Sequence, residues 1–272
     1  MEPVFRTLEI TAGTLVRLQG TRRRYSGLEH VPRSGGVVLA LNHNGYLDFL
    51  APALGLYRRG RRGRFMVKSE LMDVGIMRFL IRHTGSVPVD RSAGAQAYRA
   101  AVDTLRAGHV VVVYPESTIS RSFELKEFKT GPVRMARDAG VPIVPAVHWG
   151  AQRQWSKGTR RRAGFTRIPV HVRFGEPVVV PADADVETAT RDLRDTMERL
   201  LHDVQAGYPE APAGADWLPA RLGGGAPTPA EALGIEDAEA REKARRRAER
   251  AVREKADQDA RERPKENRPD DR

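Results

Sequence analysis

A histidine and an aspartate stand five positions apart in residues 42–48, which read NHNGYLD. The apolar run at residues 36–40 is typical of a buried strand, and the following Asn44-Gly45 dipeptide is a turn signal. Such a turn can bring the carboxylate of Asp48 back against the ring of His43. An imidazole that a carboxylate orients can take a proton from a hydroxyl group. A pair of this kind is more often structural when it stands alone, so the rest of the chain decides its role.

The elements that must position this pair alternate along residues 35–208. Short β-rich runs predict strands at 37–41, 64–67, 86–89, 110–114, 143–149 and 168–174. Helical patterns lie at residues 49–56, 69–82, 93–107, 131–139 and 186–205. This alternation favours an α/β layered domain with a central, largely parallel mixed sheet flanked by helices.

The chain divides by composition into four parts. Residues 1–29 predict an N-terminal amphipathic helix at 4–18 and a basic segment after it, and the apolar face of this helix could lie in a membrane interface or pack on its own domain. Residues 30–208 predict the main domain, and residues 209–235 a linker rich in Gly and Pro. Residues 236–272 form a charged tail, predicted to be helical as far as residue 262 and disordered beyond it.

The composition limits the class of protein. The 272 residues include no cysteine, which excludes disulfides and a cysteine acyl-enzyme, and no apolar run is long enough to span a membrane. We therefore expect a cytoplasmic protein. The net charge of +11 indicates acidic partners, and the basic clusters at residues 22–24, 58–64 and 157–162 flank apolar segments.

Four blocks in order carry a family resemblance. They are NHNGYLD at 42–48, GSVPVDR at 85–91, YPESTIS at 114–120 with FKTG at 128–131, and VPIVPAV at 141–147, and KSEL at 68–71 adds a fifth, shorter element. Together they resemble the lysophosphatidate acyltransferases of the glycerolphosphate acyltransferase superfamily, over about residues 30–205.

The resemblance implies transfer of a fatty acyl group to the free hydroxyl of 1-acylglycerol 3-phosphate, which gives phosphatidate in phospholipid biosynthesis. The donor would be an acyl thioester, either acyl-CoA or acyl carrier protein, with no other cofactor. Glycerol 3-phosphate or another lysolipid is the alternative acceptor. We expect the protein to associate peripherally with the anionic inner face of the cell membrane and not with nucleic acid. A non-catalytic protein that binds nucleic acid or a membrane surface is the alternative of a different class, but it leaves the four blocks unexplained.

The resemblance assigns roles to particular residues. His43 would be the general base and Asp48 its orienting group, while Arg91 would bind the acceptor phosphate and Glu116 would order the donors around the acceptor. Further substrate-binding candidates are Ser117, Thr118, Lys68, Lys129 and Arg121. The oxyanion donors could be backbone amides near His43 or the side chain of Lys68.

The third block departs from the family pattern at two positions. Ser117 stands where glycine is usual, and Ile119 stands where arginine is usual, which removes a phosphate donor. Arg121 could reach back and replace it. No G-x-S-x-G elbow indicates a serine hydrolase, and the remaining histidines lack metal-ligand spacing, so no metal is expected.

Overall fold

The computed structural model describes residues 3–89, 94–162, 164–209 and 211–262, with the side chains of residues 4–249 inside these ranges. The chain forms two compact units, Met1–Ala226 and Pro227–Arg272. The predicted catalytic residues all belong to the larger unit.

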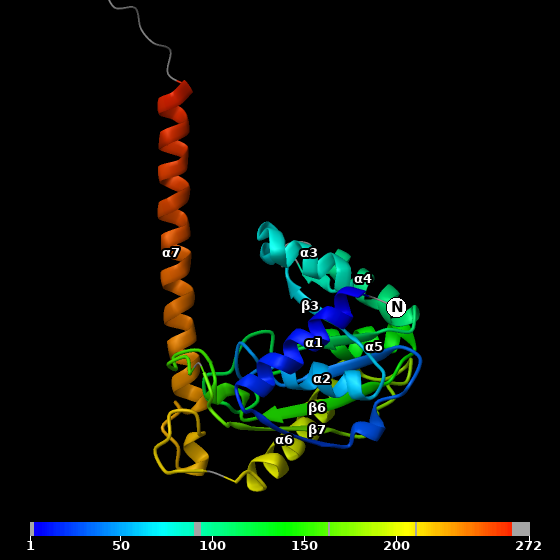
Figure 1. Ribbon diagram of the computed structural model, residues 1–272. Coiled ribbons are helices and arrows are strands. Elements are labelled where there is room, and N and C mark those ends of the chain that lie inside the picture. Colours follow the sequence, from blue (N-terminus) through cyan, green and yellow to red (C-terminus); the bar gives the residue numbers. More distant parts are fainter. Residues whose placement is uncertain (1–2, 90–93, 163, 210, 263–272) are drawn as a thin grey trace, which may run out of the picture. The chain divides into compact units, whose positions relative to one another are not determined.

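A seven-stranded sheet runs through the described part of the larger unit (Figure 1). Its strands are β1 (Arg22–Ser26), β2 (Val37–Leu41), β3 (Gly63–Lys68), β4 (Val87–Val89), β5 (Val110–Val113), β6 (Ile143–Trp149) and β7 (Pro169–Phe174). They lie in the order β1-β7-β6-β2-β5-β3-β4, and every neighbouring pair is parallel except β6 and β7. Strands buried on both faces need continuous apolar side chains, which is why β2 (VVLAL) and β5 (VVVV) lie inside the sheet. The predicted central, largely parallel mixed sheet is confirmed.

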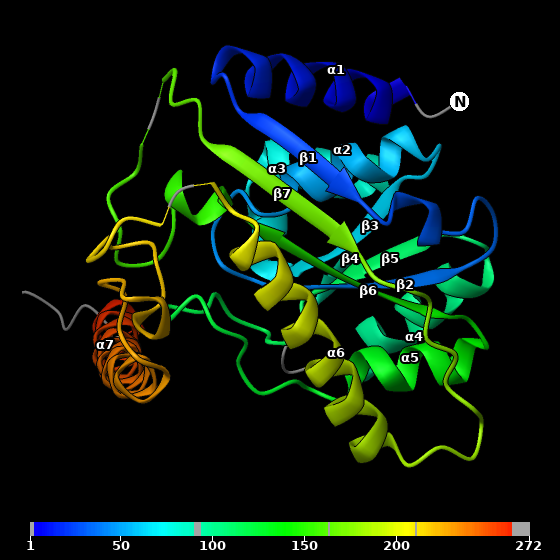
Figure 2. The same ribbon diagram turned by 90° about the horizontal axis from the view of Figure 1, so that it is seen from below.

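Helices cover both faces of this sheet. They are α1 (Pro3–Leu18), α2 (Leu50–Arg58), α3 (Gly75–Thr84), α4 (Gly94–Arg106), α5 (Gly131–Ala139) and α6 (Val186–Ala206). Figure 2 shows α1 and α2 on one face and α4, α5 and α6 on the other. Alternate side chains of β2 enter two cores: Val38 clusters with Met197 of α6, and Leu39 clusters with Leu56 of α2.

The helix predicted at residues 69–82 is interrupted. A 3-10 helix, η2 (Ser69–Asp73), comes first, Val74 is extended, and α3 then begins at Gly75. The helical spacing of apolar residues continues through this break, so the pattern alone did not reveal it.

The basic segment at residues 22–24 was not predicted as a strand, but it belongs to β1. This strand pairs in parallel with β7 at the edge of the sheet, and its residues alternate between exposed and half-buried. Tyr25 faces inward and donates a hydrogen bond to the carbonyl oxygen of Ala51, 2.9 Å away. Charged side chains are common on edge strands, where they prevent pairing with other chains, and they hide the strand pattern.

Part of the linker expected at residues 209–235 packs against the core of the larger unit. Trp217 and Leu218 are buried in the same apolar cluster as Tyr208. A Cβ atom on Gly224 would stand 1.9 Å from the carbonyl oxygen of Leu218, so this close packing requires a glycine. The irregular chain up to residue 226 is therefore part of the larger unit.

The smaller unit contains helix α7 (Pro229–Glu262), which begins seven residues before the predicted start. Thr228 and Glu231 form a reciprocal cap, because the Thr228 backbone N–H donates to the Glu231 carboxylate (2.8 Å) and the Glu231 N–H donates to the Thr228 hydroxyl (3.3 Å). The T-P-A-E sequence at 228–231 was the available signal.

The inner face of α1 packs on its own domain, while Ile10, Leu15 and Leu18 of the same helix keep exposed side chains. Val16 is buried, Glu9 forms an ion pair with Arg62 (2.9 Å), and the ring of Phe5 lies under the guanidinium of Arg64. Among the described residues, no helix combines the length and the apolar character that crossing a membrane requires.

Candidate active site

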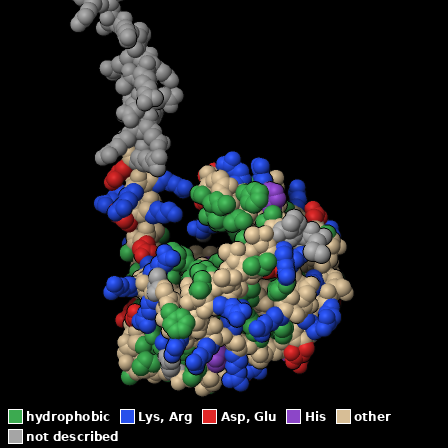
Figure 3. Space-filling view, viewed as in Figure 1, with side chains coloured by type: hydrophobic (Ala, Val, Ile, Leu, Met, Phe, Trp, Pro, Cys, Tyr) green, Lys and Arg blue, Asp and Glu red, His purple; other side chains and the backbone are tan. Residues whose placement is uncertain are grey.

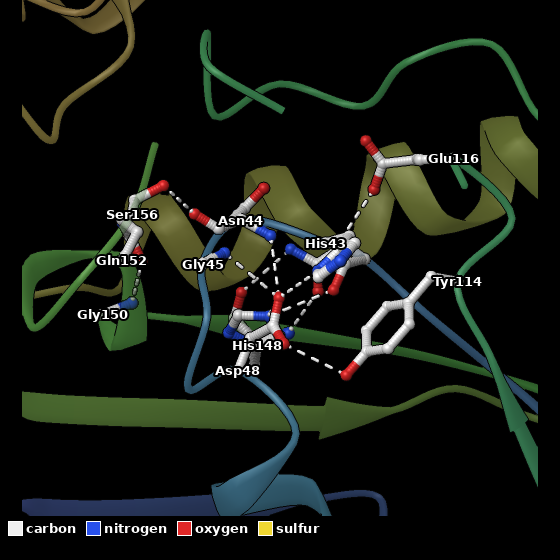
Figure 4. Close-up of polar contacts among 11 residues, drawn as sticks. His43, Asn44, Gly45, Asp48, Tyr114, Glu116, His148, Gly150, Gln152 and Ser156 are labelled. Atoms are coloured by element: carbon white, nitrogen blue, oxygen red, sulfur yellow. Dashed lines mark hydrogen bonds and ion pairs between the residues drawn. The ribbon is translucent and has the colours of Figure 1, made fainter. Parts of the chain in front are cut away.

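The carboxyl end of β2 carries the candidate site (Figure 4). Asn42, which follows the strand, is fully buried, and its side chain pairs with the backbone of His148 on β6. The Asn42 amide donates to the His148 carbonyl (3.1 Å), and the His148 N–H donates to Asn42 Oδ1 (2.8 Å). The turn therefore starts from a fixed point in the middle of the sheet.

Gly45 allows the turn to pass close to the segment after β6. A Cβ atom on this residue would stand 2.7 Å from the carbonyl oxygen of Trp155. The same carbonyl accepts the backbone N–H of Tyr46 (3.1 Å), and the Ser156 hydroxyl donates to the carbonyl of Asn44 (2.5 Å). These contacts fold the chain back and bring Asp48 toward His43.

His43 and Asp48 meet as the sequence predicted. His43 Nδ1 lies 2.7 Å from Asp48 Oδ2, and the His43 side chain keeps 21% of its surface exposed while that of Asp48 keeps 2%. Since Nδ1 faces the carboxylate, Nε2 is the ring nitrogen available to a substrate. The ring also stacks on Tyr114, with 4.1 Å between centroids and 22° between planes.

Asp48 is held as a carboxylate. Its Oδ2 also accepts the backbone N–H groups of Asn44 (3.0 Å) and Gly45 (3.1 Å), and its Oδ1 accepts the Tyr114 hydroxyl (3.1 Å). Burial alone would raise the pKa of this group, but hydrogen bonds from the neighbouring histidines outweigh it and hold the pKa well below its usual range. The orienting group thus stays charged at neutral pH.

Sequence reasoning missed two residues of this site. His148 was only one of the histidines without metal-ligand spacing, yet its Nε2 lies 3.6 Å from Asp48 Oδ2 and 3.1 Å from the carbonyl oxygen of Asn42. Tyr114 was noted only as the aromatic residue that opens the third block. His148 lies near the carboxyl end of β6 and Tyr114 directly follows β5, and this position at the ends of strands was the available signal.

Glu116 is buried, and it acts on the backbone of the turn. Its Oε1 accepts the His43 N–H (2.8 Å), and its Oε2 accepts the Lys126 N–H (3.1 Å). Burial, the largest influence, raises the pKa of Glu116 from its ordinary 4.5 to about 8. Glu116 therefore holds the backbone of His43 and Lys126 in place, and its effect on the donors around the acceptor stays a prediction.

The expected oxyanion donors near His43 are already occupied. The backbone N–H of His43 donates to Glu116, those of residues 44 and 45 donate to Asp48, and that of residue 46 donates to Trp155. The Lys68 side chain, the other candidate that the sequence left open, takes no part in these hydrogen bonds of the turn. Lys68 ends β3 with an exposed side chain, and β2 and β3 both run parallel to β5, so both end at the same edge of the sheet.

Comparisons with known proteins agree with this geometry. The acyltransferase family profile matches residues 22–149, which include His43, Asp48, Tyr114, Glu116 and His148. Residues 22–149 form an acyltransferase domain. The matched stretch ends with β6, so the strand that carries His148 is its last element.

Similar proteins include two 1-acyl-sn-glycerol-3-phosphate acyltransferases. That of Borreliella burgdorferi is 22% identical over 69% of this chain and 75% of its own length, and the alpha enzyme of Homo sapiens is 29% identical over 76% and 72%. The crystal structure of the 1-acyl-sn-glycerophosphate acyltransferase PlsC from Thermotoga maritima matches with a TM-score of 0.63 and 23% identity, over 75% of this chain and 81% of that one. This last likeness establishes the shared fold.

The substrate-binding candidates of the third block are only partly gathered at the site of the acyltransferase domain. Ser117 is exposed and adopts the left-handed backbone conformation (φ 61°) that glycine favours, which explains why glycine is usual there. Thr118 accepts a hydrogen bond from the Lys126 ammonium group (2.8 Å). Ile119 is buried, with 5% of its surface exposed, and provides no cation.

The remaining cationic candidates differ in position. Lys129 has an exposed side chain, and its backbone N–H donates to the carbonyl of Pro115 (2.9 Å). The Arg121 guanidinium reaches the segment after β6, because a Cβ atom on Gly158 would stand 2.7 Å from its Nη1. Arg91 lies outside the described residues. Within the described part of the chain, no group of three or more His, Asp or Glu is placed to hold a metal ion.

We expect Glu116 to make stability depend on pH. Because the folded protein keeps the Glu116 proton up to about pH 8 and the unfolded chain loses it near pH 4.5, this group's contribution to stability is present below pH 4.5 and is lost as pH rises toward 8. Between these pH values the free energy of unfolding falls by at most about 1.4 kcal/mol per pH unit. Denaturant unfolding at pH 5, 6.5 and 8 checks this, and Glu116→Gln is expected to remove the dependence. An equal slope in both proteins would contradict the assignment.

Proposed function

We propose that residues 30–208 catalyse acyl transfer from an acyl thioester to the free hydroxyl of 1-acylglycerol 3-phosphate, with His43 as base. The observation that carries the proposal is the 2.7 Å contact between His43 Nδ1 and the buried Asp48 carboxylate, with the ring left accessible. The similar proteins from Borreliella burgdorferi and Homo sapiens bear the name of this activity. The chain spans about two thirds to three quarters of the length of such relatives.

The proposed reaction is a direct transfer. His43 Nε2 takes the proton of the acceptor hydroxyl, and the oxygen attacks the thioester carbonyl carbon to form the new C–O bond. The tetrahedral intermediate then collapses with cleavage of the C–S bond, and the imidazolium returns its proton to the departing thiolate. Asp48 stabilises the imidazolium between these steps, and Lys68 is our candidate donor to the oxyanion. A thioester is already activated, so no enzyme nucleophile is needed.

Glycerol 3-phosphate or another lysolipid is the alternative acceptor, and one feature of the third block supports this alternative. The buried Ile119 leaves the third block without its usual arginine, which alters the set of groups that can bind the acceptor phosphate. The change bears on the acceptor and not on the His43–Asp48 pair.

A panel of acceptors tests this proposal. Purified protein is supplied with oleoyl-CoA and with lysophosphatidate, glycerol 3-phosphate or lysophosphatidylcholine, and the released thiol is read with a thiol reagent, since the protein contains no cysteine. We expect the highest kcat/KM with lysophosphatidate. A higher value with either of the others would assign the enzyme to that acceptor.

We predict that Arg91→Ala raises the KM for the acceptor far more than the KM for the acyl donor. Arg91 is assigned to the acceptor phosphate, which a guanidinium group binds through paired hydrogen bonds, and losing them typically costs tenfold or more. Initial rates over both substrate concentrations measure the two constants. If the loss appeared only in the donor constant, Arg91 would belong to the donor site.

We further propose peripheral association with an anionic membrane through the exposed face of α1. The uncharged exposed residues of this face are Thr7, Ile10, Thr11, Thr14, Leu15 and Leu18. Ile10 and Leu18 keep 57% and 69% of their surface exposed, and the exposed Arg6 and Arg17 supply charge on the same helix.

An apolar patch formed by Val74 and the first turns of α3 adjoins this helix. Val74, Ile76 and Phe79 keep 50%, 64% and 45% of their surface exposed, and Figure 3 shows hydrophobic side chains gathered over α3 with Lys and Arg side chains around them. Helices α1 and α3 are in contact. The basic cluster at residues 58–64 offers fewer cations to an anionic membrane than the sequence suggested, because Arg61 and Arg64 are buried and bind backbone carbonyls.

We predict that Ile10→Glu with Leu18→Glu abolishes most binding to anionic vesicles while leaving activity on detergent-dispersed acceptor largely intact. Each apolar side chain contributes about 1.5–3 kcal/mol when it leaves water, and a carboxylate is repelled by anionic lipid. Flotation at low and high salt measures binding. Point substitutions are preferable to removing residues 1–20, because the inner face of α1 is packed. Val179→Glu, at another exposed apolar residue (77%), is the control; equal binding by the double variant and wild type would contradict the proposal.

A further inference from the structure

The segment at residues 155–162, here called the basic strap, is attached to the turn that carries His43. It follows β6 and reads WSKGTRRR. Its Trp155 carbonyl accepts the Tyr46 N–H (3.1 Å), and its Ser156 hydroxyl donates to the Asn44 carbonyl (2.5 Å). The strap is therefore held next to the candidate active site by contacts with residues 44–46.

Aromatic rings and a guanidinium group form a tilted stack where the strap meets the turn. The rings of Tyr46 and Trp155 have centroids 4.5 Å apart and planes at 41° to each other, and the Arg161 guanidinium lies over the Trp155 ring, 5.1 Å from its centroid. Tyr46 is 43% exposed, Arg161 is exposed and Trp155 is half-buried. Solvent-accessible flat groups such as Tyr46 and Arg161 can bind a nucleic-acid base by stacking.

Positive charge is concentrated around this stack. The strap contains four basic residues, Lys157, Arg160, Arg161 and Arg162, and no acidic residue. Arg121 adds a fifth cation from the third block, since its Nη1 approaches Gly158 closely. Arg162 lies 3.7 Å from Asp216 at an exposed position, where an ion pair contributes little. Guanidinium groups bind phosphate through paired hydrogen bonds.

We propose that the basic strap and Tyr46 bind the nucleotide end of acyl-CoA, with the adenine on the Trp155–Arg161 stack and the phosphates on the arginines. This inference rests on the proposed acyl transfer and selects between its two donors. An acyl carrier protein would present an acidic protein surface to the same charges, but it carries no base for the aromatic stack. The base and phosphates together match both features of the strap.

Trp155 itself reports on the first test. The protein has three tryptophans, and the other two, Trp149 and Trp217, are buried (1% and 3% exposed). Adenosine 3′,5′-bisphosphate is added to wild-type protein while tryptophan fluorescence is followed, and phosphopantetheine, which lacks the base, is the comparison. We expect saturable quenching by the nucleotide only. No response to the nucleotide, or an equal response to phosphopantetheine, would overturn the proposal.

A kinetic test uses two donors that differ only in the nucleotide. The double substitution Arg160→Ala with Arg161→Ala is expected to raise the KM for oleoyl-CoA about tenfold to a hundredfold and to leave the KM for oleoyl-phosphopantetheine unchanged. Arg199→Ala, at an exposed arginine on α6, is the matched control and is expected to change neither constant.

The outcomes separate this site from the proposed function. An equal rise for both donors, or transfer from acyl carrier protein but not from oleoyl-CoA, would overturn the nucleotide site while acyl transfer stands. Nucleotide quenching without transfer from any donor would support the site and contradict the proposed function.

Discussion

Replacing His43 by alanine is expected to lower acyl transfer by about a hundredfold to ten-thousandfold. The substitution removes the group that takes the proton of the acceptor hydroxyl and returns it to the leaving thiolate. The fold is expected to persist, because Asp48 keeps its hydrogen bonds from Tyr114 and from the backbone of residues 44 and 45. Thiol release at saturating substrates measures the loss, and circular dichroism and thermal unfolding check the fold.

A second histidine provides the matched control for this experiment. His202→Ala changes an exposed histidine on α6 and is expected to retain wild-type turnover. If folded His43→Ala protein turned over at a rate near that of wild type, His43 could not be the base.

Replacing Asp48 by asparagine is expected to cost a similar factor in kcat, again about a hundredfold to ten-thousandfold. Asparagine can keep much of the geometry: its oxygen can accept the N–H groups that now reach Oδ2, and its NH₂ group can donate to Tyr114 where Oδ1 now accepts. What disappears is the negative charge that stabilises the His43 imidazolium. The effect should therefore fall on kcat while the two KM values change little.

The same substitution has a predicted effect on stability. The low pKa of Asp48 means that its contribution is fully present above the unfolded value of about 3.8 and is lost as pH falls through the folded value. Asp48→Asn is thus expected to unfold more easily than wild type at pH 7, and the difference is expected to shrink below about pH 4. Urea unfolding at pH 7 and pH 3 measures both differences; a constant difference, or wild-type kcat in the variant, would contradict the role given to the carboxylate.

The sequence predicted the candidate site best where one short segment contains both the strand and the side chains that would react. The strand at 37–41, the Asn44-Gly45 turn and the return of Asp48 to His43 are local, so spacing and turn chemistry were enough to predict them. The parallel sheet followed from the alternation of strands and helices, which any crossover between parallel strands requires.

Contacts between distant segments were beyond the reach of such patterns. Tyr114 and His148 reach Asp48 only because β5 and β6 both lie beside β2, and nothing in residues 110–149 taken alone indicates that order. The occupied amides of residues 43–46 depend likewise on Glu116 and Trp155, which are far away in the chain. Residues 22–26 form an edge strand through pairing with β7, although their own side chains are mostly charged.

We infer that this protein moves an acyl group from a thioester to a lysolipid hydroxyl. Mass spectrometry of the products from wild-type protein, oleoyl-CoA and 1-oleoylglycerol 3-phosphate tests this inference. We expect phosphatidate and free CoA in equal amounts, with negligible free oleate. Release of oleate and CoA without phosphatidate would show a hydrolase, and the absence of both phosphatidate and CoA from every acceptor and donor pair would contradict the claim altogether.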